Sequence, residues 1–182
     1  MENYTNNLSL VIPNSNHEDE YNRIMDKWEL LENNIQPELM RRYSKKLGAN
    51  IPFKKWLEYC KDDRTTGSML STNIPCTLFF LVNESNEILG CIVMNHSITH
   101  RGHLHAGIVP WHRGKGYGTV MLNLALSKCL EMGINRVQIT PRKDNLRAIS
   151  TIIKNGGILI DEFYDDNVKV LRYEIDVLAQ LK

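Results

Sequence analysis

Hydrophobic side chains recur along the chain with two different periods, which predicts a mixture of helices and strands. From Tyr21 to Leu31 the apolar positions follow a 3.6-residue period, so we expect a helix over residues 18–32, preceded by a short strand over residues 8–12. A second helix is expected to begin at Pro52, and the polar residues 61–73 are expected to form a loop. The apolar faces of these helices place Trp28 and Trp56 in the predicted core.

From Cys76 onward, β-branched and aromatic residues gather in short runs, as is typical of strands. We expect a hairpin over residues 77–82 and 88–94, then strands over residues 102–109, 136–140, 158–164 and 169–175. Helices are expected over residues 118–132 and 145–154, the second capped by Asp144. This order predicts a mixed α/β domain with one βαβ unit at its centre, formed as a single domain by residues 1–182 with a core of about residues 8–176.

Composition narrows the classes of protein that this pattern fits. The 182 residues include 22 Lys and Arg against 21 Asp and Glu, a formal net charge of +1, whereas a protein that coats DNA has a strongly basic face. The longest apolar stretch, residues 76–82, is too short for a membrane span, and the N-terminus does not resemble a signal peptide. We therefore expect a cytoplasmic, soluble protein that binds neither nucleic acid nor membrane.

The most informative segment is a glycine-rich loop, residues 109–119, between a predicted strand and a predicted helix. Gly114, Gly116 and Gly118 let the backbone approach a ligand, and the start of the following helix offers free N–H groups to an anion. The spacing fits neither a Walker A loop nor a GxGxxG dinucleotide fingerprint. The loop therefore predicts a phosphate or pyrophosphate site of another kind, with positive charge from Arg113 and Lys115.

The segment resembles the acetyl-CoA-binding motif of the GNAT family of N-acetyltransferases, with Arg113, Gly116 and Gly118 at its motif positions. Residues 144–149 are similar to the Asn-x-x-Ala-Ile element that follows in the family, and residues 86–90 to its preceding hairpin. Further short segments, among them residues 95–96, 102–103 and 155–157, resemble a bacterial branch of predicted acetyltransferases. The resemblance implies an α/β fold of the mixed α+β type. Its central, mostly antiparallel sheet has about six to seven strands that splay at the cofactor site, and about four helices flank it.

The resemblance also implies an activity, in which acetyl-CoA is the co-substrate and its acetyl group moves directly to an amine. The cofactor-binding residues that it implies are Gly107, Ile108, Val109, Arg113, Gly114, Lys115, Gly116, Tyr117, Gly118, Thr119 and Asn145. The loop from Arg113 to Thr119 would hold the pyrophosphate, and residues 106–109 would pair with the pantetheine arm. A small-molecule amine is expected as the acceptor in preference to a protein.

Five of the six histidines lie between His96 and His112, and imidazole is well suited to proton transfer near neutral pH. His103 and His96 are the predicted bases for the acceptor amine, and His105 shares a strand face with His103. In the family, a Tyr on the helix after Asn145 commonly protonates the leaving thiolate, but Ile152 occupies that position here. Tyr164 is the predicted substitute, with Tyr117, Ser150 or unassisted departure as alternatives.

Two other functions remain open from the sequence. The presence of Ile152 where the family commonly has a Tyr is compatible with an acyl-CoA-binding module that has lost catalysis. His103 and His105, together with His96 or His100, would supply enough imidazoles for a metal-dependent hydrolase, although the glycine loop favours acyl transfer and no metal ligands are assigned. An exposed edge strand near the C-terminus is expected to allow a homodimer.

Overall fold

The computed structural model describes residues 7–41, 43–44, 49–67 and 73–180 of the chain. Seven strands form one sheet in the order β1-β4-β5-β6-β7-β9-β8, with antiparallel pairing between all neighbours. Their bounds are β1 (Ser9–Val11), β4 (Cys76–Val82), β5 (Ile88–Thr99), β6 (Gly102–Ile108), β7 (Arg136–Ile139), β8 (Ile158–Asp165) and β9 (Val168–Asp176). A separate two-stranded pair joins β2 (Tyr43–Ser44) to β3 (Ala49–Asn50).

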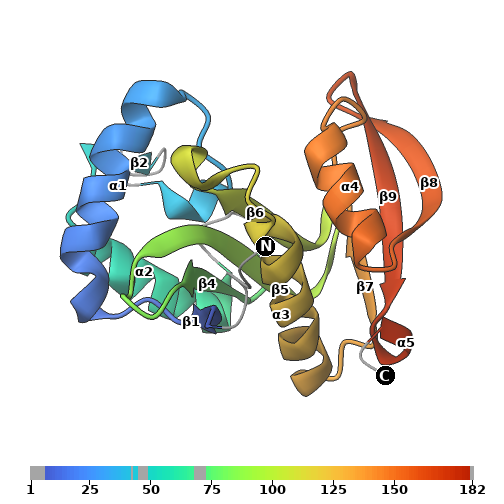
Figure 1. The fold of residues 1–182 in the computed structure, drawn as a ribbon, viewed down its shortest axis with the longest axis horizontal. Coiled ribbons are helices and arrows are strands. Elements are labelled where there is room, and N and C mark those ends of the chain that lie inside the picture. Colours follow the sequence, from blue (N-terminus) through green and yellow to red (C-terminus); the bar gives the residue numbers. More distant parts are fainter. Residues whose placement is uncertain (1–6, 42, 45–48, 68–72, 181–182) are drawn as a thin grey trace.

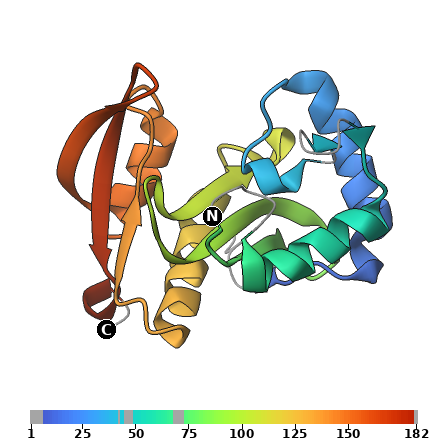
Figure 2. The ribbon, with the colours of Figure 1, turned by 180° about the vertical axis from the view of Figure 1, so that it is seen from behind.

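Helices cover both faces of the sheet (Figures 1 and 2). They are α1 (Glu18–Leu31), α2 (Phe53–Thr66), α3 (Tyr117–Glu131), α4 (Leu146–Lys154) and α5 (Val177–Gln180), with short 3-10 helices η1 (Ser15–His17), η2 (Glu38–Met40) and η3 (Pro110–His112). The first two α-helices pack on one face and α3 on the other. The arrangement confirms the predicted mixed α/β fold and the predicted number of strands.

Strand alternation divides the core into two clusters, because successive side chains of a strand point to opposite faces. On the face covered by α1 and α2, Trp56 stacks against Tyr21 with ring centroids 4.5 Å apart and against Phe80 at 5.9 Å. Trp28 is also fully buried in this cluster, so both tryptophans are core residues as predicted. The opposite cluster lies under α3 and includes Ile152.

The sheet is weakest between β6 and β7. A single residue pair, Gly102 with Ile139, joins these two strands, whereas seven register pairs join β4 to β5. The pair is antiparallel, so the central strand–helix–strand segment lacks the extended parallel pairing that a βαβ unit implies. Beyond this pair, the described residues of β6 form no further ladder pair with β7, and Figure 1 shows α3 crossing where the two halves of the sheet diverge.

Three local predictions need correction. Helix α2 continues to Thr66 and ends at Gly67, whose φ of +64° suits glycine, because the polar residues after Lys61 mostly occupy the solvent-facing side of the helix. Residues 68–73 of the predicted loop lie largely outside the described residues. Strand β5 extends to Thr99, since its polar end turns directly into β6. The side chain of Asn145, not Asp144, caps α4 by accepting the Ala148 N–H at 3.1 Å. None of the described helices has the length and apolar character needed to cross a membrane.

Candidate active site

The glycine loop turns from β6 into α3 and leaves a row of backbone donors free. Gly114 and Gly116 have φ values of +80° and +84°, and an added Cβ at either position would meet no atom within 4 Å. The N–H groups of residues 114–118 donate to no acceptor among the described residues, and α3 begins at Tyr117. An exposed cradle of N–H groups at the start of a 15-residue helix fits a pyrophosphate, because the helix dipole adds partial positive charge.

The Arg113 side chain is engaged in holding this loop. Its guanidinium forms two hydrogen bonds with the carboxylate of Glu32, one of them 2.9 Å long, and its Nε donates to the Ile108 carbonyl at 2.9 Å. Glu32 directly follows α1 and also accepts the Trp28 indole N–H at 2.8 Å. These bonds, led by the one from Arg113, lower the pKa of Glu32 to about 2. Arg113 therefore positions the cradle, and Lys115 is the exposed cation beside it.

The other loop residues take supporting places. Tyr117 and Thr119 lie half-buried in the first turn of α3, where the Thr119 carbonyl accepts the Asn155 amide at 3.3 Å. An added Cβ at Gly118 would touch Thr151 of α4 at 3.5 Å, so the first turn of α3 packs against α4. The Oδ1 atom of Asn145 is used by the helix cap, which leaves its amide nitrogen to contact a cofactor.

The strand that precedes the loop is covered on one face and open along one edge. An added Cβ at Gly107 would come within 1.9 Å of the Gln36 carbonyl oxygen, so the segment after α1 packs directly on β6. Val109 is buried and donates its N–H to Leu89, whereas the edge of β6 that faces β7 is unpaired after Gly102. Gly107, Ile108 and Val109 thus lie where an extended ligand would pair with the strand.

The two predicted bases lie on opposite faces of the sheet. His103 is 7% exposed on the α1/α2 face, and its Nδ1 accepts the backbone N–H of Gln138 at 3.0 Å. His96 lies on the face of Met94 and Thr77, with its Nε2 2.8 Å from the Thr77 hydroxyl. Burial lowers the pKa of both imidazoles. The Gln138 N–H of β7 thus bonds to a side chain of β6 in place of a backbone carbonyl. His103 therefore links β6 to β7 next to their single residue pair, Gly102 with Ile139.

His105 shares the face of His103, as the sequence predicts, but has no hydrogen bond among the described residues. It lies half-buried opposite Val93. Burial, assisted by the charge of Arg101, lowers its pKa to about 4, so the imidazole is neutral at pH 7. Nearby in the ladder, Asn95 is 1% exposed and donates to the Gly102 carbonyl, while its Oδ1 has no partner within the described chain. The face therefore holds an unbonded, neutral imidazole.

The remaining histidines are dispersed. His112 is buried in η3 with its Nε2 3.1 Å from Glu87, and His100 lies 3.5 Å from Asp165 on the far half of the sheet. Among the described residues, no three His, Cys, Asp or Glu side chains form a group that could hold a metal ion. The clustering of histidines in the sequence therefore does not become a cluster of ligands in space.

The predicted acid lies on a different strand from the predicted bases, although its neighbour Asp165 contacts Arg101 just before β6 at 3.0 Å. Tyr164 is 70% exposed on β8, and β9 and β7 separate that strand from β6. Ile152 is the buried residue of α4 and packs into the core cluster under α3, so its side chain contributes packing. Tyr117, at the first turn of α3, is the tyrosine nearest in sequence to the glycine cradle.

Comparison with known proteins identifies the class that this cradle and open strand define. The model of the Acetyltransferase (GNAT) family matches residues 36–156, which is more than half of the chain, and the chain therefore belongs to this family. The predicted activity is confirmed at this level: the protein is an acetyltransferase whose co-substrate is acetyl-CoA. No curated protein sequence matches the chain significantly.

Solved structures share the fold at low sequence identity. The spermidine N-acetyltransferase from Vibrio cholerae, solved in complex with CoA and spermine, is 16% identical, with a TM-score of 0.62 over 97% of this chain and 99% of that chain. A chimera of the Vibrio cholerae enzyme and hSSAT is 17% identical, with a TM-score of 0.64 and the same coverage. These likenesses confirm the predicted GNAT fold.

Proposed function

We propose that this chain is a cytoplasmic, single-domain N-acetyltransferase that acts on a small-molecule amine. The observation that supports acetyl-CoA binding is the row of free N–H groups over residues 114–118 beside the unpaired edge of β6. The sequence has no long acidic or basic tract of the kind that recognises a macromolecular acceptor. The solved spermidine N-acetyltransferase, which shares the fold, supports a small amine, with polyamines as the first compounds to test.

The chain's own residues would divide the work of binding. The free N–H groups at the start of α3 hold the pyrophosphate, with Lys115 adding charge, and the open edge of β6 from Gly107 to Val109 orients the arm. The amide nitrogen of Asn145 is available to the arm from the start of α4. Acetyl-CoA supplies an activated acetyl group as a thioester. The ion pair of Arg113 with Glu32 keeps the loop in place without touching the anion.

The amine must lose a proton as its nitrogen bonds to the acetyl carbon. His103 and His96 were the bases predicted from the sequence, and His105 is a better candidate on geometry. Its two ring nitrogens have no partner among the described residues, so they are free to accept a proton, although burial lowers its pKa to about 4 in the unliganded protein and so weakens it as a base. His103 would position β6 against β7 through Gln138, and His96 would act only if the acceptor reached the opposite face.

The leaving thiolate needs a proton only after the carbon–sulfur bond breaks. Tyr164, the acid predicted from the sequence, is separated from β6 by two strands, and Ile152 cannot donate a proton. A thiol is acidic enough to leave as the thiolate near neutral pH, so departure without a protein acid is the simplest course.

The C-terminal edge strand supports a homodimer. Ile158, Leu159 and Ile160 of β8 are 70%, 49% and 49% exposed, on an edge that no other described strand covers. Antiparallel pairing of two copies about Leu159 would match Ile158 of one copy with Ile160 of the other. Apolar residues on an open edge favour such association.

An acceptor screen tests the proposal directly. Purified protein is mixed with acetyl-CoA and single amines, including spermidine, spermine, amino acids and a lysine-containing peptide, and thiol release is recorded. We expect release with a small amine, and none from a variant with the cradle blocked at Gly116. If CoA binds but no amine accelerates thiol release, the catalytically silent CoA-binding module is the better description.

A further inference from the structure

A cavity of about 450 Å³ lies between α2 and the segment that joins β1 to η1. Thirteen residues line it: Ile12, Pro13, Asn14, Ser15, Glu18, Phe53, Lys54, Leu57, Glu58, Cys60, Lys61, Arg64 and Leu78. Its wall on the sheet comes from Leu78 of β4, on the same face of the sheet as His105, but β5 separates β4 from β6, and none of the lining residues belongs to β6 or to the glycine loop. Its volume is that of a small-molecule site, for which about 300–1,000 Å³ is usual.

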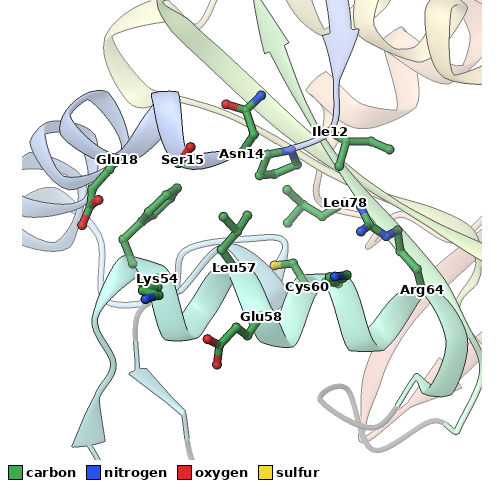
Figure 3. Close-up of a pocket in the computed structure, with 13 residues that line it drawn as sticks. Ile12, Asn14, Ser15, Glu18, Lys54, Leu57, Glu58, Cys60, Arg64 and Leu78 are labelled. Atoms are coloured by element: carbon green, nitrogen blue, oxygen red, sulfur yellow. The ribbon is translucent and has the colours of Figure 1, made fainter.

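The floor of the cavity is apolar. On α2 the positions of Phe53, Leu57, Cys60 and Arg64 recur every three to four residues, which brings these side chains to one face of the helix. Phe53, Cys60 and Leu78 are each 5% exposed or less. Figure 3 shows Leu57 and Cys60 directed from α2 toward Leu78 and Ile12 across the gap. This floor suits a hydrocarbon chain or an aromatic ring.

The rim is mainly cationic. Lys54, Lys61 and Arg64 all come from α2, and none of them forms an ion pair within the described part of the chain. Of the two acidic residues, Glu58 is paired with Lys55 at 3.1 Å, and Figure 3 shows it pointing away from the cavity, whereas Glu18 lies at the end opposite Arg64. Arg64 is half-buried and extends across the gap beside Leu78. An unpaired guanidinium against an apolar wall favours an anionic group at that end.

We propose that this cavity binds a small amphipathic carboxylic acid, with its apolar body between Leu57 and Leu78 and its carboxylate on Arg64. A fully apolar ligand would leave the guanidinium unpaired, and a cationic ligand at the Arg64 end would lie beside an unpaired cation, with Glu58 already paired and Glu18 at the opposite end. Its lining shares no residue with β6 or with the glycine loop, and the proposal does not depend on the identity of the acceptor amine.

Octanoate is a suitable probe, used with saturating CoA so that the acyl-transfer site is occupied. Calorimetry is expected to show one octanoate bound per chain, with 1-octanol and octylammonium bound at least about tenfold more weakly. Amide chemical shifts are expected to change around Ile12, Leu57 and Leu78. The absence of octanoate binding, equal affinity for 1-octanol, or shift changes confined to residues 113–119 would each overturn the proposal.

Reversal of the single charge at Arg64 gives the sharper test. We expect Arg64→Glu to weaken octanoate binding at least about tenfold and to favour octylammonium over octanoate. Lys128→Glu, a charge reversal at a half-buried lysine of α3 on the opposite face of the sheet, serves as the control and should leave octanoate affinity within about twofold of the wild type. Octanoate affinity that stays unchanged in Arg64→Glu would show that the guanidinium does not recognise the carboxylate.

Discussion

Arg113 of the glycine loop and Glu32 at the end of α1 form a two-point ion pair across 81 positions of sequence. The Arg is a motif position of the family, but here its charge is directed toward α1 and away from the cradle. The pair joins the helical layer on one face of the sheet to the loop that begins the helical layer on the other. A loop held in this way presents its N–H groups in a fixed arrangement before any ligand binds.

We expect Glu32→Gln to lower the thermal midpoint by about 2–4 °C at pH 7 and to raise KM for acetyl-CoA. Both side chains are about a third exposed, so solvent screening limits the pair to about 1 kcal/mol. Glu131→Gln, which breaks the exposed pair with Lys128, is the control and should change neither quantity. An unchanged KM in Glu32→Gln would mean that the ion pair does not position the cradle.

The same pair predicts a pH dependence of stability. The pKa of Glu32 is about 2 in the folded protein against an ordinary 4.5, so the folded state binds this proton less readily. The stabilisation is complete above about pH 5 and is lost as the pH falls toward about 2. The difference in thermal midpoint between the wild type and Glu32→Gln should therefore shrink across this range, and a constant difference would contradict the assignment.

The cradle can be tested with two glycines in the same backbone conformation. Gly116 and Gly133 have φ values of +84° and +78°, and neither has an atom within 4 Å of an added Cβ. Gly116→Trp and Gly133→Trp should therefore suffer similar backbone strain, but only the first covers the free N–H groups. CoA should raise the thermal midpoint of the wild type and of Gly133→Trp, and not that of Gly116→Trp. Equal shifts in all three proteins would place the cofactor elsewhere.

Variants of His103 and His105 should differ in kcat, because only His105 is proposed to act as the base. We expect His105→Gln to lower kcat at least about tenfold with little change in KM for acetyl-CoA, as for a general base. His103→Asn keeps an acceptor for the Gln138 N–H and should retain most of kcat. His103→Leu leaves that N–H unsatisfied and should cost about 1–3 kcal/mol of stability. Loss of kcat in His103→Asn with normal stability would instead make His103 the base.

The pH profile of kcat distinguishes these histidines independently. With a pKa of about 4, His105 is in its basic form at every pH above about 4. The wild-type profile should therefore lack an ascending limb near pH 6.5, the ordinary pKa of histidine. An ascending limb near pH 6.5 that His105→Gln leaves in place would indicate another base.

The homodimer depends on the exposed residues of β8. Leu159→Arg should convert a dimer to a monomer in light scattering, because two charges would meet at the centre of the antiparallel pair. Leu30→Arg, at a leucine of α1 that is 87% exposed, should have no effect. A wild-type protein that is monomeric at micromolar concentration would exclude this interface.

Much of the fold follows from local sequence signals. Periodicity, the proline that precedes α2 and glycines such as Gly133 predicted most of the helices and strands, because each signal acts within a few residues. The predicted ends of α2 and β5 were wrong. Polar residues continue α2 along its exposed side, and polar residues carry β5 into its turn. The pairing of β6 with β7 through Gly102 alone depends on contacts between distant segments, which local patterns do not contain.

The sequence by itself determined the anion cradle, because a glycine loop between a strand and a helix places free N–H groups at the helix start in any surrounding fold. Only the tertiary structure decided what the charged and titratable side chains do. It directs Arg113 to Glu32, separates His96 from His103 by the thickness of the sheet, and leaves His105 unbonded. These outcomes depend on which partner lies within hydrogen-bonding distance, and that is set by the packing of residues far apart in the chain.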